Sequence, residues 1–214
     1  MGAEAPSGPM APPGPDPLAG ALSQALAGFR AQPPADMALA GGGRFLPRDA
    51  GGGVVRLSYC GQEVDVSWPD GGVAPASLLS RAEHILVLQY LAARGAVPPR
   101  GSWLAFLDLP GGSHHLQPFL AGAVEPLARA FGRRPGRLVE AGRRLGGRGL
   151  AVGSAAVEVP ALPRVPIAAV VWAEDPEFAA RAGVLFDVTA PLHLTTASLY
   201  VLGIEVSRRL VEAG

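Results

Sequence analysis

The sequence predicts an α+β fold in a single domain, with a mixed or antiparallel sheet of about four or five strands flanked by helices. Two observations lead to this class. Short segments with strand character fall into two groups, and helix-forming segments separate the groups. Strands and helices also do not alternate strictly, as they would in a doubly wound parallel sheet.

The amino-terminal part combines a proline-rich start with the first group of strands. Residues 1–17 contain mostly proline, glycine and alanine, so we expect a disordered extension ahead of a domain over residues 18–214. Apolar spacing predicts a helix over residues 18–31, ended by two prolines. Segments 54–59 and 63–68 predict two strands joined as a hairpin, and the glycine-flanked segment before them reads as a linker.

Helices dominate the middle of the chain. A broad apolar face predicts a helix over residues 75–94, with Gly95 as its C-cap. The apolar run 103–109 is a strand or a short packed segment. The conformational loop Pro110, Gly111 and Gly112 interrupts it. Further helices are expected over residues 116–131 and 137–145.

The carboxy-terminal part supplies the second group of strands. Segments 155–159, 167–172 and 184–188 have strand character. Residues 176–181 suit one or two helical turns. Thr195 is a good N-cap for a terminal helix that continues through Leu210.

The basic residues are all arginine, and this excludes several enzyme classes. The chain contains 18 arginines and no lysine, against 18 acidic residues, for a formal net charge of zero. Without lysine there can be no Schiff-base lysine, no phosphate-loop lysine and no Ser-Lys dyad. A net charge of zero gives no overall attraction to nucleic acid or to anionic membranes. Nucleic acid and membrane partners are therefore disfavoured, and another protein is the expected partner.

Cys60 is the single cysteine. One cysteine can form no intramolecular disulfide, and it cannot hold an iron–sulfur cluster unless a partner shares the ligation. We therefore expect no cofactor held by this chain. The cysteine usage suits a reducing compartment, and no signal peptide or spanning run is recognisable, so a cytoplasmic location is expected.

Several motifs in order along the chain resemble a known prokaryotic family. They include an LVLQYL stretch, a Leu-Pro-Gly-Gly loop, and a proline-flanked segment followed by a tryptophan and an acidic cluster. The matching positions are Leu86–Leu91, Leu109–Gly112, Phe119, Phe131, Leu145–Gly147, Leu162–Pro166, Trp172, Asp175–Phe178 and Leu185–Asp187. On these residues the chain resembles domain of unknown function 3786, from about Leu78 to Leu210.

The resemblance implies little about activity, because the family is uncharacterised. It implies an anaerobic setting, in a redox or corrinoid-linked system. Some relatives carry a cysteine-rich iron–sulfur segment ahead of the domain, and this chain departs from them because its amino-terminal extension has no cysteine. An acidic residue expected near residues 196–199 is also missing.

The acidic cluster after Trp172 is the first candidate site. If the strands that end at Trp172 and Asp187 are neighbours, Asp187 could approach Asp175 at one sheet edge, with His193 nearby. Such a group could bind a divalent metal or act in acid–base catalysis. Trp172, Phe178 and Phe186 would wall the pocket. Alternatively, Asp175 and Asp187 are helix and turn caps with no chemical role.

Two further groups stand out. Ser113-His114-His115 follows the conformational loop and could ligate a metal, although adjacent side chains point in different directions. Six arginines lie between residues 133 and 148, and Arg143 and Arg144 among them could bind an anion or RNA. Exposed histidines and a solvated arginine-rich helix face are the structural alternatives.

Three functional hypotheses follow from these candidates. The first is a small cytoplasmic accessory domain that binds a ligand or a partner at the aromatic and carboxylate pocket. The second is a metal-assisted or carboxylate acid–base enzyme that uses Asp175, Asp187 and His193. The third is an anion- or RNA-binding protein that acts through the arginines.

Overall fold

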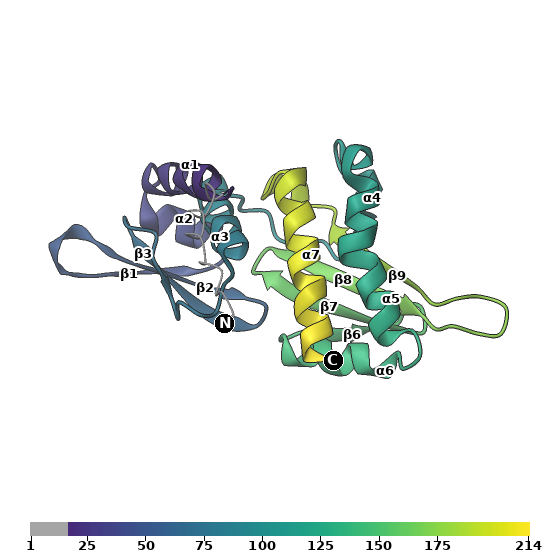
Figure 1. The fold of residues 1–214 in the computed structure, drawn as a ribbon. Helices are drawn as coiled ribbons and strands as arrows, with labels where there is room; N and C mark the ends of the chain where they lie inside the picture. The colour runs from purple at the N-terminus through teal and green to yellow at the C-terminus, as the bar shows by residue number, and fades with distance from the viewer. Residues whose placement is uncertain (1–16) are drawn as a thin grey trace, which may run out of the picture.

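The computed structural model describes residues 17–214, apart from the side chain of Ala50. The expected disordered extension, residues 1–17, lies outside this range except for Pro17. The described chain forms two lobes placed side by side (Figure 1). The first lobe comprises residues 17–94 and the second comprises residues 102–214. Residues 95–101 form the inter-lobe linker.

The first lobe contains a four-stranded antiparallel sheet in the order β1-β2-β3-β4, with helices α1, α2 and α3 on one side of it. Helix α2 contacts β1 and β2, and α1 packs on α3. The strands are β1 Arg44–Pro47, β2 Gly53–Tyr59, β3 Gln62–Trp68 and β4 Val73–Ala74; the helices are α1 Ala19–Arg30, α2 Pro34–Ala40 and α3 Arg81–Ala93. A short 3₁₀ turn, Asp49–Gly51, lies in the loop between β1 and β2.

The expected hairpin over residues 54–59 and 63–68 is confirmed by the pairing of β2 with β3. Cys60 and Gly61 occupy its turn with φ angles of 46° and 76°. Positive φ at both central residues is typical of the two-residue turns that match strand twist. A Cβ at Gly61 would lie 2.7 Å from the Leu145 carbonyl oxygen, so glycine is also required for packing against the second lobe.

Helix α3 begins later than residue 75, at Arg81, because a capping box fixes its start. Ser80 Oγ accepts a hydrogen bond from Glu83 N at 3.2 Å, and Glu83 Oε2 accepts one from Ser80 N at 2.7 Å. At the other end the C-cap is Arg94, in a left-handed conformation with φ 53°, and not Gly95. The cap is thus one residue earlier than expected.

The second lobe contains a five-stranded antiparallel sheet in the order β5-β9-β8-β7-β6. Its strands are β5 Trp103–Ala105, β6 Arg148–Leu150, β7 Ala155–Leu162, β8 Val165–Trp172 and β9 Arg181–Asp187. Its helices are α4 Leu116–Phe119, α5 Glu125–Phe131, α6 Gly136–Arg144 and α7 Thr196–Ala213. Short 3₁₀ segments occupy Phe106–Asp108, Gly112–His115 and Ala190–Leu192. Helix α7 lies between α3 of the first lobe and α4–α5 of the second (Figure 1).

The helix expected over residues 116–131 is one continuous helical segment with a π-helical middle. The π turn, Leu120–Val124, joins α4 to α5. Ser207 of α7 donates a hydrogen bond to the carbonyl oxygen of Ala123 within this turn. The neighbouring helix therefore hydrogen-bonds a backbone carbonyl within the π turn.

One hydrophobic cluster runs through both lobes. In the second lobe its centre is aromatic: the rings of Phe106 and Phe119 stack with centroids 4.1 Å apart, and Phe186 lies beside both. A Cβ at Gly203 would come within 2.7 Å of the Phe119 ring, so this glycine lets α7 approach α4 closely. None of the helices in residues 17–214 is both long and apolar enough to cross a membrane.

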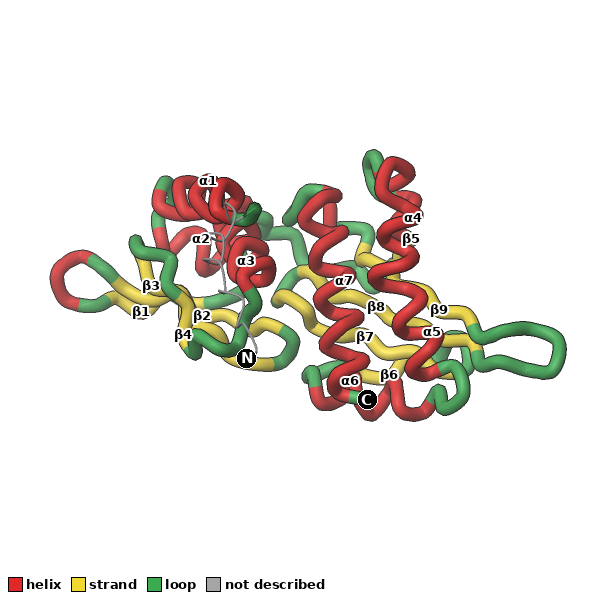
Figure 2. The backbone as a smooth tube through the Cα atoms, viewed as in Figure 1, coloured by secondary structure: helices red, strands yellow, loops and turns green. Residues whose placement is uncertain are grey.

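The α+β class and the antiparallel pairing are confirmed, with two corrections. There are two sheets and not one, because the two groups of strands pair only within themselves, and the supposed linker between glycines 43 and 51 contains β1 of the first sheet. Residues 176–181 do not form a helical turn. Most of them belong to the loop between β8 and β9, which projects from the second lobe (Figure 2).

Candidate functional site

The candidate site is a cleft between the two lobes, where α1 and α3 face the start of α7. Two adjoining cavities of about 240 Å³ and 330 Å³ share the lining residues Gln89, Thr195 and Ser198. The smaller cavity is otherwise lined by Leu18, Ala21, Ala82, Ile85, Leu86, Ala197 and Val201. The larger one continues along α3 to its last residue, Ala93, and to residues 191–194. We call this surface the inter-lobe cleft.

A chain of hydrogen bonds marks the junction of the two cavities. Ser198 Oγ donates to Gln89 Oε1 at 2.9 Å. Because this uses the only hydroxyl proton of Ser198, Thr195 must be the donor in the 2.9 Å contact between Thr195 Oγ1 and Ser198 Oγ. Within the described residues the Gln89 Nε2 amide makes no hydrogen bond. Gln89 can therefore donate to a ligand, and the hydroxyl chain holds it in that orientation.

The inter-lobe cleft has no charged side chain in its lining, since its single titratable group is His193. Burial lowers the pKa of His193 below its usual value of 6.5, and the imidazole is 1% exposed. The ring is therefore neutral near neutral pH. An ion that entered the cleft would lose its hydration and find no counterion, which is costly.

Asp187 anchors the inter-lobe linker. Its carboxylate accepts hydrogen bonds from Arg100 N at 3.0 Å and Gly101 N at 2.7 Å, and from Thr189 Oγ1 at 2.7 Å. Burial alone would raise the pKa of Asp187, but these hydrogen bonds and that from Thr189 N hold it below its usual value. The Asp187 carboxylate is ionised and fully buried, and most of its hydrogen bonds come from backbone N–H groups. This is the capping role that the sequence offered as the alternative.

His193 holds the other end of the linker. Its Nε2 atom lies 2.9 Å from the Val97 carbonyl oxygen, to which the neutral ring donates. The Nδ1 edge packs so closely on Gly95 that a Cβ there would overlap the ring. Asp187 and His193 thus fix the position of one lobe relative to the other.

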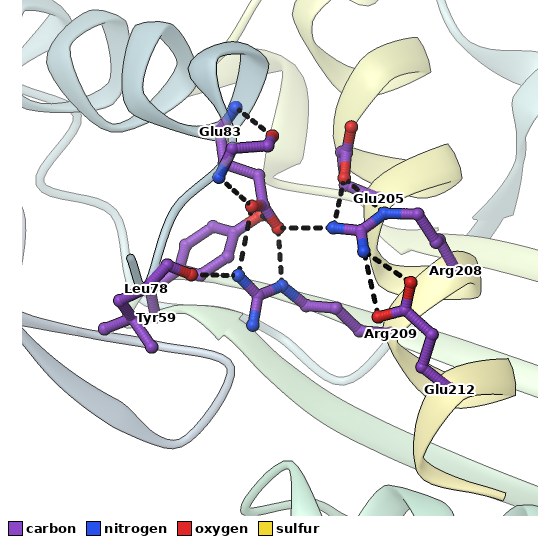
Figure 3. A network of polar contacts seen from close by, with 8 residues as sticks. Tyr59, Leu78, Glu83, Glu205, Arg208, Arg209 and Glu212 are labelled. Carbon is purple, nitrogen blue, oxygen red and sulfur yellow. Dashed lines mark hydrogen bonds and ion pairs between the residues drawn. The ribbon is translucent and has the colours of Figure 1, made fainter. Parts of the chain in front are cut away.

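A buried ion pair makes a second connection between the lobes (Figure 3). Arg209 of α7 donates to both carboxylate oxygens of Glu83 in α3: Nε bonds to Oε1, and Nη2 bonds to Oε2 at 3.0 Å. Nη2 also donates to the Leu78 carbonyl oxygen at 2.6 Å. The Tyr59 hydroxyl donates to Glu83 Oε1 at 3.2 Å. On the exposed side, Arg208 adds ion pairs to Glu205 and Glu212.

Each charged side chain of this network has a partner of opposite charge, so we interpret the network as a structural connection between the lobes. Glu83 is 0% exposed and its pKa is lowered: burial acts in the opposite direction, but hydrogen bonds from Arg209 and from Ser80 N outweigh it. Beside it, burial raises the pKa of the Cys60 thiol to about 12. A buried, protonated thiol is a poor nucleophile.

The predicted aromatic and carboxylate pocket is not assembled, because β8 and β9 are antiparallel. Trp172 is opposite Arg181, whereas Phe186 is opposite Ile167 at the other end of the pair. Asp175 therefore lies at one end of β9 and Asp187 at the other, about 20 Å apart at the usual rise per residue. Phe178 is 65% exposed on the loop, and Phe186 is fully buried.

The conformational loop and the nearby histidines have structural surroundings. The Pro110 carbonyl oxygen accepts a hydrogen bond from Thr196 Oγ1 at 2.7 Å, which ties the loop to α7. Gly111 has a φ of 73°, and a Cβ at Gly112 would overlap the Phe106 carbonyl oxygen. His114 is exposed and contacts the Gly111 carbonyl oxygen. In residues 17–214 no three His, Cys, Asp or Glu side chains gather as a metal site would need.

Arg143 and Arg144 do not form a pocket together. Arg144 donates to the carbonyl oxygen of Ala213 and Arg137 to that of Gly214, both beside the end of α7. Arg143 is exposed. Two other arginines of the same stretch are in ion pairs, Arg133 with Glu174 and Arg148 with Glu158.

The sequence did contain a weak signal for the residues that line the cleft. Gln89 is a polar residue within the apolar LVLQYL stretch of α3, and Thr195 was recognised only as a helix cap. Ser198 lies 109 residues from Gln89, so their contact depends on how the lobes meet.

Comparison with known proteins places the chain in a family. No curated protein and no solved structure is found to match it. A family model, however, matches residues 33–209, which takes in α2 of the first lobe through most of α7 and so both sides of the inter-lobe cleft. The chain belongs to the family described as Domain of unknown function (DUF3786).

Proposed function

We propose that this protein is a binding domain whose inter-lobe cleft holds a small, uncharged, mostly apolar molecule. The observation that carries the proposal is the position of Gln89: its free amide lies at the junction of two apolar cavities, oriented by Ser198. A ligand with a carbonyl or ether oxygen would accept a hydrogen bond there.

Charge and size support this class of ligand. The cleft lining offers no counterion for a carboxylate, a phosphate or an ammonium group. Its apolar walls come from Ile85, Leu86 and Val201, which favour a hydrocarbon body. A cavity of about 330 Å³ suits a molecule of modest size.

The proposal makes the protein a binding domain and not an enzyme, because the hydroxyls of the cleft are not paired with a base. Ser198 bonds to Gln89 and Thr195, whereas His193 bonds to the Val97 carbonyl oxygen. The described residues also hold no cluster of metal ligands. It keeps the protein in the cytoplasm, where a lone buried thiol such as Cys60 would stay reduced. An accessory role in an anaerobic redox or corrinoid-linked system remains a prediction from the resemblance alone.

The test uses three probes with the same ring and different charge: cyclohexyl methyl ketone, cyclohexanecarboxylate and cyclohexylmethylammonium. Binding is followed by amide chemical shifts in two-dimensional NMR. We expect the ketone to bind with a dissociation constant on the order of 1 mM. The two ions should bind at least about tenfold more weakly, because the cleft cannot neutralise them.

The Gln89→Leu variant tests the hydrogen bond. Removing the amide donor should weaken ketone binding by roughly tenfold. Gln117→Leu, on the exposed surface of α4, is the matched control and should bind like the parent protein. Equal binding of all three probes, or ketone binding unaffected by Gln89→Leu, would overturn the proposal.

A further inference from the structure

The loop between β8 and β9, residues 173–180, projects from the second lobe and has a defined shape (Figure 1). Asp175 Oδ1 accepts hydrogen bonds from Glu177 N at 2.8 Å and Phe178 N at 2.7 Å. Asp175 N donates to the Phe178 carbonyl oxygen at 3.0 Å. These bonds close a tight turn, so the loop presents its side chains in a fixed arrangement.

Apolar side chains are exposed at this end of the molecule. Phe178 is 65% exposed on the turn, and Trp172 is 39% exposed at the end of β8. The guanidinium of Arg181 lies 5.9 Å from the Trp172 ring centroid. A large aromatic side chain held outward on an ordered turn is a common anchor in protein interfaces.

The loop is acidic and lies directly beside a basic segment. Glu177 has no ion pair among the described residues, and the Asp175 carboxylate bonds only to backbone N–H groups. The basic segment is the turn from α5 into α6, with Arg133 and Arg134, and Arg134 likewise has no side-chain partner in the described chain.

Two contacts show that the acidic and basic segments adjoin. Glu174 N donates to the Gly132 carbonyl oxygen at 3.3 Å, and Arg133 Nε donates to Glu174 Oε1 at 2.9 Å. An acidic patch and a basic patch therefore lie next to each other on the same face. Such a face is complementary to itself: a two-fold rotation between the patches places each against its opposite.

We propose that this face binds a second copy of the same chain. A two-fold axis beside the Arg133–Glu174 pair brings the acidic loop of each copy against the arginine turn of the other. Phe178 of each copy is then covered at the contact. Nucleic acid fits the face less well, because the carboxylates of Asp175 and Glu177 repel phosphates.

The two-fold arrangement sets the strength and the salt dependence of the dimer. Its charges are at the rim of the contact and its apolar area is small, so the dissociation constant should be micromolar, on the order of 10 μM. Added salt should weaken the dimer because exposed charges are screened.

Charge reversal tests the arrangement, with sedimentation equilibrium of the full chain as the measurement. Glu177→Arg and Arg134→Glu should each raise the dissociation constant at least about tenfold, because like charges then meet twice across the axis. An equimolar mixture of the two variants should recover the parent affinity, since in the mixed dimer an arginine faces a glutamate at both contacts.

Two controls separate this result from a general effect of charge. Asp70→Arg makes the same change of charge on an exposed turn of the first lobe and should leave the dimer unchanged. Phe178→Ala should weaken the dimer without altering net charge. Either of two results would overturn the proposal. One is a parent protein that stays monomeric at about 200 μM in low salt. The other is a dimer whose dissociation constant is unchanged by both Glu177→Arg and Phe178→Ala.

Discussion

Arg209 and Glu83 connect the two lobes through a two-pronged ion pair that the protein buries almost completely. The side chains are 14% and 0% exposed, and they lie 126 residues apart in the sequence. The same Glu83 carboxylate caps α3 and accepts hydrogen bonds from the Tyr59 hydroxyl and from the Arg209 guanidinium (Figure 3). The start of one helix and the end of another are therefore fixed by one carboxylate.

Removing one partner of this pair should be strongly destabilising. Glu83→Ala leaves Arg209 without its partner and removes the capping box, so we expect a loss of about 3–5 kcal/mol in the free energy of unfolding. Chemical denaturation followed by circular dichroism measures it. Replacing both residues together, as Glu83→Leu with Arg209→Leu, should cost less than the two single changes combined.

The control for that measurement is an exposed ion pair of the same chemistry. Arg129 and Glu125 are 71% and 60% exposed at a separation of 3.8 Å. Glu125→Ala should cost no more than about 1 kcal/mol. Equal losses for Glu83→Ala and Glu125→Ala would contradict the role assigned to burial.

The lowered pKa of Glu83 predicts how stability depends on pH. Because the folded protein holds this pKa below its usual value of 4.5, the ionised carboxylate favours folding above that value. The contribution is lost as pH falls through the lower, folded-state pKa. The stability difference between the parent and Glu83→Gln should therefore be largest near neutral pH and shrink in acid. A stability difference between the two proteins that grows as the pH falls below 4.5 would contradict a lowered pKa of Glu83.

Asp187 and Asp175 should respond very differently to substitution by alanine. Asp187→Ala removes the anchor of the inter-lobe linker and leaves the buried N–H group of Thr189 and the N–H group of Gly101 without their acceptor, so we expect a loss of about 2–4 kcal/mol. Asp175→Ala affects an exposed turn and should cost about 1 kcal/mol or less. Thermal unfolding of both variants makes the comparison, and equal losses would argue against the anchor.

Filling the inter-lobe cleft should block binding without unfolding the protein. Ala197 is exposed on the first turn of α7 and lines the smaller cavity, so Ala197→Leu places a larger side chain inside it. Affinity for cyclohexyl methyl ketone should fall at least about tenfold, with stability unchanged within about 0.5 kcal/mol. Ala27→Leu, exposed on α1 outside the cavity lining, is the matched control and should bind normally.

Local signals predicted much of the fold. The Cys60-Gly61-Gln62 connection between two short strands indicated the hairpin, and the structure narrows the turn to Cys60 and Gly61. Thr195 indicated the start of the terminal helix, where it accepts a hydrogen bond from Ser198 N. These features depend on neighbouring residues alone. Strand β1 was missed because the glycines on both sides of it resemble a linker.

The candidate site could not be derived in the same way, because it depends on strand register and on the placement of the lobes. A short loop joins β8 to β9, which makes them antiparallel and brings Trp172 to Arg181. Asp187 therefore lies at the opposite end of this strand pair from Asp175. Gln89 and Ser198 meet only because Asp187, His193 and the Glu83–Arg209 pair hold the lobes together.

The most direct test of the proposed binding function is to locate a bound molecule within the protein. We would record intermolecular nuclear Overhauser effects between cyclohexyl methyl ketone and selectively labelled methyl groups. The inter-lobe cleft predicts contacts with Ile85, Leu86 and Val201, which come from α3 and α7. Contacts with methyl groups elsewhere, such as Val152 or Leu107, with none at these three residues, would contradict it.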